Sequence, residues 1–87
     1  MLEGTKTLAG IGLDRITFNP RVMGGRARIR GLRMPVSQIL NLVAAGLTTA
    51  AVIAEYEFLE PADVAQSLKY AAWMASEEMH PLDVAAE

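Results

Sequence analysis

Two helix-breaking positions, Gly46 and Pro61, divide the second half of the chain into three short apolar segments. Pro35 opens the first segment and suits the first turn of a helix. Thr48 or Thr49 can cap the second helix through a side-chain oxygen, and Pro61 begins the third. The spacing predicts helices of about 10, 9 and 15 residues, and three such helices with tight connections are typical of a helix-turn-helix module.

Each predicted helix carries apolar side chains at intervals of three or four residues, which place them on one face. The first two helices present Val36, Ile39, Leu40, Val43 and Leu47, then Val52, Ile53 and Tyr56. The predicted stripe of the third consists of Val64, Leu68, Ala71, Ala72 and Ala75, widened by Trp73 and Met74. Glu60 occupies the cap position of this third helix, and Asp63 complements the positive end of its dipole. These faces predict one helical core within residues 35–79.

The first half of the chain instead shows the period of two that strands require. Ile16 and Phe18 alternate with polar residues and are followed by the turn residue Asn19. Ile29 alternates with arginines in a second segment of this kind. The pattern predicts a short antiparallel ribbon within residues 14–31, with the three apolar side chains facing inward.

Three arginines, Arg26, Arg28 and Arg30, alternate along the second strand segment, and we expect them to project from one face of it. They would span roughly 13 Å, a length suited to tracking a phosphate backbone. Gln66 and Lys69, outside the apolar stripe of the third helix, would then contact nucleic acid as well. The other interpretation is a solvated ribbon face that pairs with acidic residues of a partner subunit. The residues alone leave both interpretations open.

Length and charge indicate one small domain that works with partners. A chain of 87 residues has a marginal core, and such domains often gain stability by forming oligomers. Residues 1–33 carry seven basic and two acidic side chains, whereas residues 34–87 carry one and eight. We expect a flexible arm at 1–13, a helix-turn-helix domain at 14–79 and an acidic tail at 80–87.

Several classes of protein do not fit the sequence. The absence of a signal-peptide pattern and of cysteine favours a cytoplasmic protein. The uncharged run Met34–Ala54 has 21 residues, but its polar residues and internal helix breaker favour two buried helices over a membrane span. The segment GIGLDR lacks the third glycine of a dinucleotide fingerprint, and His80 with Asp83 supplies too few ligands for a closed metal site. We therefore expect no catalytic residue, no cofactor and no metal.

Residues 16–72 match the pattern of a known family at specific positions. The family segment G-x-P-x-I-x-G-T-R-I-P-V is matched by Gly25, Ile29, Gly31, Arg33, Pro35 and Val36. Later matches are Gly46, Tyr56, Leu59, Asp63, Val64, Leu68, Tyr70 and Ala71. Asn19, Ala27 and Leu32 depart from the pattern, where the family has Asp, Pro and Thr. The segment thus resembles the family catalogued as domain of unknown function 433, the VapB-like antitoxins.

This resemblance implies a mainly α-helical, homeodomain-like helix-turn-helix with a short N-terminal β segment, often forming a homodimer. It also implies an antitoxin that neutralises a PIN-like ribonuclease toxin and binds its own operator DNA. Such a toxin gathers carboxylates around divalent metal, so an inhibiting cation would come from the arginine-rich segment, with Arg28 or Arg33 as the best guesses. Leu82 and Val84 in the tail would dock on an apolar groove away from the metal, or inhibition would work by covering the surface alone. The alternative function is a protein-interaction and dimerisation module that binds no nucleic acid.

Overall fold

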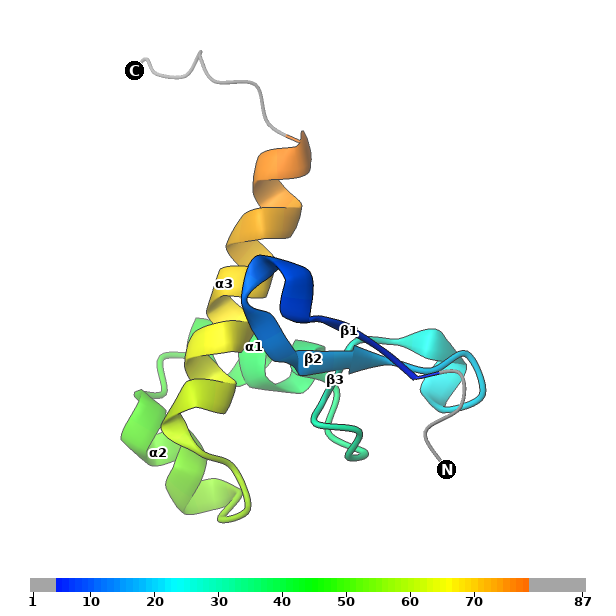
Figure 1. The fold of residues 1–87 in the computed structure, drawn as a ribbon. Helices are drawn as coiled ribbons and strands as arrows, with labels where there is room; N and C mark the ends of the chain where they lie inside the picture. Colours follow the sequence, from blue (N-terminus) through cyan, green and yellow to red (C-terminus); the bar gives the residue numbers. More distant parts are fainter. Residues whose placement is uncertain (1–4, 79–87) are drawn as a thin grey trace, which may run out of the picture.

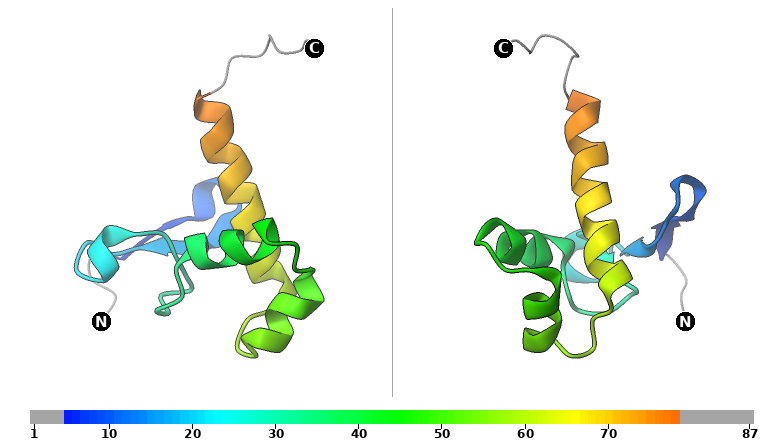
Figure 2. Two further views of the ribbon diagram at one scale, coloured as in Figure 1. Left: turned by 180° about the vertical axis from the view of Figure 1, so that it is seen from behind. Right: turned by 90° about the vertical axis from the view of Figure 1, so that its left-hand side faces the viewer.

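The computed structural model describes residues 5–78, which form three helices and a three-stranded antiparallel sheet (Figure 1). In chain order the elements are β1 (Lys6–Leu8), β2 (Leu13–Phe18), β3 (Arg28–Ile29), α1 (Val36–Ala44), α2 (Thr49–Glu55) and α3 (Pro61–Glu78), with 3-10 turns at Ala9–Ile11 and Met23–Gly25. Figure 2 shows α3 between the sheet on one side and α1 and α2 on the other. The C-terminal half of α3 extends beyond both. The mainly helical class predicted from the sequence is confirmed, but the sheet is larger than the predicted ribbon.

The sheet has β2 at its centre, with β1 and β3 on either side. Ile16 in β2 lies opposite Ile29 in β3, and both side chains are completely buried, as predicted. Burial of each isoleucine is worth about 2–3 kcal/mol in transfer free energy. This central apolar pair, together with Leu13 of β2, forms the sheet's part of the buried core.

The sequence predicts a flexible arm at 1–13, but the described part of this segment contains β1 and the first 3-10 turn. Thr7 in β1 lies opposite Thr17 in β2, and the register shifts before Leu8. Asn19 Nδ2 also donates a hydrogen bond to Thr5 Oγ1 at 3.1 Å, which fixes the start of the strand beside the end of β2. Backbone hydrogen bonds to β2 therefore order Lys6–Leu8, although only one of these three side chains is apolar.

A tight turn ends β3 after only two residues. Arg30 and Gly31 have φ angles of +48° and +72°, in the left-handed region where a strand cannot continue. The chain folds back, so that the Leu32 amide donates to the Ile29 carbonyl and the Ile29 amide to the Met34 carbonyl. The predicted ladder of Arg26, Arg28 and Arg30 on one strand face is therefore wrong, since only Arg28 belongs to the strand.

The predicted helix starts are confirmed to within a residue, and the helices have 9, 7 and 18 residues where the sequence predicts about 10, 9 and 15. Pro35 immediately precedes α1, and Gly46, with a φ of +105°, follows its end. The Thr48 hydroxyl accepts a hydrogen bond from the Ala51 amide at 3.1 Å and caps α2. Pro61 is the first residue of α3. Local helix signals in this half of the chain therefore agree with the tertiary structure.

The core of the described residues lies where the sheet, α1 and α2 meet the N-terminal half of α3. Its buried apolar side chains are Leu13, Ile16, Ile29, Met34, Val36, Ile39, Val52, Leu59 and Val64. Leu68, predicted to lie in the buried stripe of α3, is 42% exposed, and Asp63 and Ser67 are buried instead. The buried face of α3 therefore includes Asp63 and Ser67 and differs from the predicted stripe. Between residues 5 and 78, no helix is long and apolar enough to cross a membrane.

Candidate functional site

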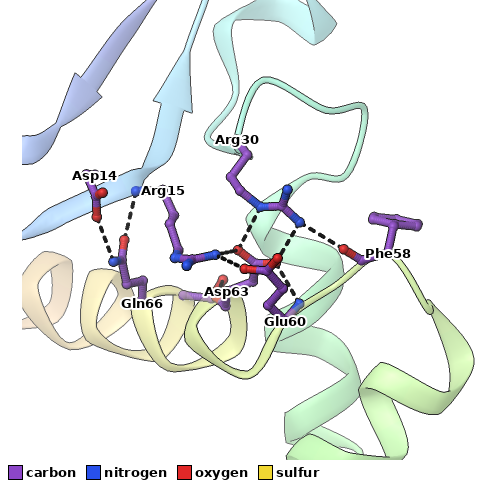
Figure 3. A network of polar contacts seen from close by, with 8 residues as sticks. Asp14, Arg15, Arg30, Phe58, Glu60, Asp63 and Gln66 are labelled. Carbon is purple, nitrogen blue, oxygen red and sulfur yellow. Dashed lines mark hydrogen bonds and ion pairs between the residues drawn. The ribbon is translucent and has the colours of Figure 1, made fainter.

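Asp63 is the centre of a polar network that joins β2, the turn after β3 and the start of α3 (Figure 3). Its completely buried carboxylate accepts hydrogen bonds from Arg15 Nη1 at 2.9 Å and from Arg30 Nε and Nη2 at 3.1 and 3.0 Å. The Glu60 backbone amide donates to the same carboxylate at 2.8 Å, as in a capping box. Arg30 also donates to the Phe58 carbonyl at 2.8 Å. Two arginines therefore converge on one buried acid.

The network changes the acidity of its members. Burial raises the pKa of Asp63, but hydrogen bonds from Arg30, the Glu60 amide and Arg15 outweigh burial and hold that pKa below its ordinary value. Hydrogen bonding to Glu60 and Asp63 raises the pKa of Arg15, and hydrogen bonding to Asp63 raises that of Arg30. All three groups are therefore charged at neutral pH.

Gln66, predicted to contact nucleic acid, has both ends of its amide engaged within the protein. Its Oε1 accepts from the Arg15 backbone amide at 2.9 Å, and its Nε2 donates to Asp14 Oδ1 at 2.9 Å (Figure 3). The Gln66 hydrogen bond lowers the pKa of Asp14. Lys69, the other predicted contact on this helix, is exposed. The side chain of Gln66 thus ties β2 to α3 instead of facing solvent.

Arg28, predicted both as a phosphate contact and as a plug for a toxin site, is only 3% exposed. Its Nη1 donates to the carbonyls of Gly31 and Leu32, at 2.9 Å each, and its Nε has no partner among the described residues. The side chain holds the turn after β3 in place. Arg33, by contrast, is exposed.

Three arginines remain available to a partner. Arg21, Arg26 and Arg33 are exposed, and none of their side chains makes a hydrogen bond or an ion pair within residues 5–78. Leu82 and Val84, the other predicted partner contacts, lie outside the described residues. Among the described residues, the side chains of Arg15, Arg28 and Arg30 thus bind other parts of the protein, whereas those of Arg21, Arg26 and Arg33 do not. The alternation of arginines in the sequence does not distinguish the two groups.

Sequence analysis missed Arg15 altogether and gave Asp63 only a helix-dipole role. A usable signal was present at Asp63, since an acid three residues after the cap position of a helix often binds the backbone amide of that cap. No local pattern indicates that Arg15, 48 residues earlier in the chain, reaches the same carboxylate. That contact depends on the packing of β2 against α3.

A pocket of about 310 Å³ opens to solvent between the segment before β3, the start of α1 and the middle of α3. Its lining consists of Arg26, Ala27, Val36, Ser37, Leu40 and Tyr70. The Tyr70 ring lies 6.2 Å from that of Phe18 and 6.3 Å from that of Trp73, between their centroids. The pocket is therefore lined by both apolar and polar groups, and Tyr70 connects it to the rings of Phe18 and Trp73.

The part of α3 beyond the core carries large apolar side chains that solvent reaches. Leu68, Trp73 and Met74 are 42%, 38% and 43% exposed. Figures 1 and 2 show the C-terminal end of α3 clear of the sheet and of α1 and α2. Within the described part of the chain, no three His, Asp or Glu side chains are grouped as metal ligands. The arrangement offers surfaces for binding a partner.

Comparison with known proteins gives one match. No curated protein and no solved structure matches the chain. A family model described as "Protein of unknown function (DUF433)" matches residues 16–71, more than half of the 87 residues. The matched segment begins in β2 and ends in α3, and it includes Arg30, Asp63 and the pocket lining. The chain therefore belongs to the DUF433 family.

Proposed function

We propose that this protein is a non-enzymatic antitoxin, which binds and silences a PIN-like ribonuclease encoded with it. The resemblance to VapB-like antitoxins motivates the toxin class. The observation that carries the proposal is the exposed apolar part of α3, where the neighbouring residues Trp73 and Met74 are 38% and 43% exposed. Exposed apolar patches of this kind mark interaction surfaces in soluble proteins.

Two of the exposed arginines, Arg26 and Arg33, supply the electrostatic part of the proposal. A ribonuclease site that holds divalent metal is rich in carboxylates, so a basic partner associates with it faster and with better orientation. Arg28 is unsuited to entering such a site, because its guanidinium is buried against two carbonyls. Arg33 is exposed and takes its place as the best candidate for a plug.

The test is co-expression with the product of the adjacent reading frame, followed by co-purification and an assay of metal-dependent RNA cleavage. The double variant Trp73→Ser/Met74→Ser should release the nuclease, since it removes the exposed apolar groups near the end of α3. Arg33→Ala should keep the nuclease bound but restore part of its activity. Arg21→Ala, which removes another exposed arginine, is the matched control. Full binding and full inhibition by the α3 variant would contradict the proposal.

Operator binding is a second candidate function, favoured by the exposed set Arg21, Arg26 and Arg33. In a homeodomain-like arrangement α3 would be the recognition helix, yet its start carries Asp63 and Glu60, and Gln66 is already engaged. DNA binding would therefore use the arginines outside α3, with affinity falling at a log–log salt slope of roughly −0.9 per phosphate contacted. Changing the three arginines to Gln should abolish binding of an operator duplex, and unchanged binding would contradict this mode.

A further inference from the structure

The pocket beside Arg26 contains polar groups that the rest of the described protein does not use. The Arg26 guanidinium and the hydroxyls of Ser37 and Tyr70 make no hydrogen bond within residues 5–78. No acidic side chain lines the pocket. The charge of the lining is therefore positive and uncompensated, and an anionic occupant would match it.

The start of α1, where Val36 and Ser37 line the pocket, adds a further donor. Pro35 occupies the cap position and has no side-chain acceptor to offer, so no side chain caps this helix. The Val36 amide donates to the Ala27 carbonyl and the Gln38 amide to the Pro35 carbonyl, but the Ser37 amide has no acceptor within the described residues. An open amide in the first turn of a helix favours a carboxylate.

The apolar part of the pocket lining would accommodate an apolar group beside the carboxylate. Ala27, Val36 and Leu40 are its apolar lining, and the pocket volume of about 310 Å³, at the lower end of the range for ligand pockets, has room for one large side chain. Beyond the pocket, Trp73 and Met74 continue the apolar surface along α3. A small free molecule would leave this continuation uncovered, whereas a partner protein would cover both.

We propose that the pocket receives an apolar side chain of a partner protein, and that an adjacent Asp or Glu of the partner binds Arg26 and Ser37. This inference rests on the proposed function, since it names the chemistry of the segment that the toxin presents. It adds a second anchor to the exposed part of α3. Pocket and helix together form one continuous surface, with Tyr70 at the junction.

The probe is a pair of blocked tripeptides, acetyl-Leu-Asp-Leu-amide and acetyl-Leu-Asn-Leu-amide, titrated into the ¹⁵N-labelled full chain. The Asp peptide should shift the amides of Arg26, Ala27, Ser37 and Leu40, with millimolar affinity. The Asn peptide should bind about fivefold more weakly, because it cannot form the charge-assisted bond to Arg26. Equal binding of the two peptides, or shifts confined to other amides, would overturn the proposal.

Two variants place the effect at the pocket. Arg26→Gln should remove the preference for the Asp peptide, whereas Arg21→Gln, an exposed arginine outside the lining, should retain it. Ala27→Leu should fill the pocket and abolish binding of both peptides, with circular dichroism as the check that the variant is folded. If it does not fold, the comparison of Arg26→Gln with Arg21→Gln decides alone. Loss of the preference in Arg21→Gln would count against the pocket, as would shifts of the same amides by a duplex DNA.

The co-purified nuclease separates this inference from the proposed function. Arg26→Gln should weaken nuclease binding about fivefold, while Arg21→Gln leaves it unchanged. If Arg26→Gln binds as tightly as the unaltered chain and Trp73→Ser/Met74→Ser releases the nuclease, the pocket proposal fails and the antitoxin proposal stands. If the unaltered chain binds no nuclease but distinguishes the two peptides, the antitoxin proposal fails and the pocket remains a site for another acidic partner.

Discussion

Asp63 holds three separate parts of the chain together through one buried carboxylate. Asp63→Asn removes the charge that Arg15 and Arg30 share, and we expect the free energy of unfolding to fall by about 3 kcal/mol. Glu60→Gln is the matched control, because Glu60 binds Arg15 from a side chain that is 55% exposed, and its loss should cost less than about 1 kcal/mol. Urea unfolding measures both. An equal decrease in the free energy of unfolding in the two variants would show that the burial of Asp63 does not increase its contribution to stability.

Acid should destabilise the fold through the same residue. The pKa of Asp63 is lowered in the folded protein, so its carboxylate stabilises the fold at any pH above the unfolded value of about 4. This contribution is lost as the pH falls through the lowered folded pKa. The free energy of unfolding, measured at a series of pH values from neutral to about 3, should decline below about 4. Asp63→Asn should flatten the profile, and a parallel profile would assign the acid sensitivity to other carboxyls.

Arg28 should behave as a structural residue, unlike its neighbour Arg26. Arg28→Ala leaves the carbonyls of Gly31 and Leu32 without their donor and should lower stability by about 2 kcal/mol. Arg26→Ala should change stability by no more than about 0.5 kcal/mol, because its side chain is exposed. Thermal unfolding of the two variants checks the difference. A larger effect at Arg26 would reverse the assignment of the two arginines.

The alternation of arginines could not reveal these roles. Period-two spacing assigns side chains to a strand face only while the strand continues, and Arg30 leaves the extended region of backbone space. Arg30 is not glycine, so its left-handed φ has no clear signature in the sequence. The exposed residue Arg26 and the buried residue Arg28 therefore look alike before the fold is known.

Among the elements, helices are predictable here and strands are less so. Pro35, Gly46, Thr48 and Pro61 act through local backbone geometry and capping, which a sequence displays directly. The strand β1 has three residues and only one apolar side chain, and its order comes from pairing with β2. The candidate site depends on such long-range pairing, so its residues were predicted only in part.

The cap of α2 should be measurable as a local effect. Thr48→Ala removes the acceptor of the Ala51 amide and should cost about 1 kcal/mol. Thr49→Ala, one position later on the same exposed turn, should cost no more than about 0.5 kcal/mol. Hydrogen exchange at the Ala51 amide should accelerate in the first variant only. Equal exchange in both would mean that the hydroxyl bond does not protect the helix.

For the molecule as a whole, we expect a homodimer formed at the sheet edge. The strand β1 pairs with β2 on one side only, and Ile11, just after it, is 49% exposed. Light scattering at micromolar concentration should give twice the chain mass of 9.4 kDa. Ile11→Ser should shift the equilibrium toward monomer, whereas Trp73→Ser should not. A monomer mass across the concentration range would contradict the expectation.

The bonds between β2 and α3 join residues that are synthesised several seconds apart. Arg15 binds Glu60, Asp63 and Gln66, which follow it by 45, 48 and 51 residues. A ribosome that adds roughly 5–20 residues per second therefore needs about 3–10 s after Arg15 before the last of these partners exists. During that interval the nascent sheet lacks α3, the helix that packs against β2, and is open to proteases. Slow codons between positions 15 and 66 would lengthen the interval and lower the yield of folded protein.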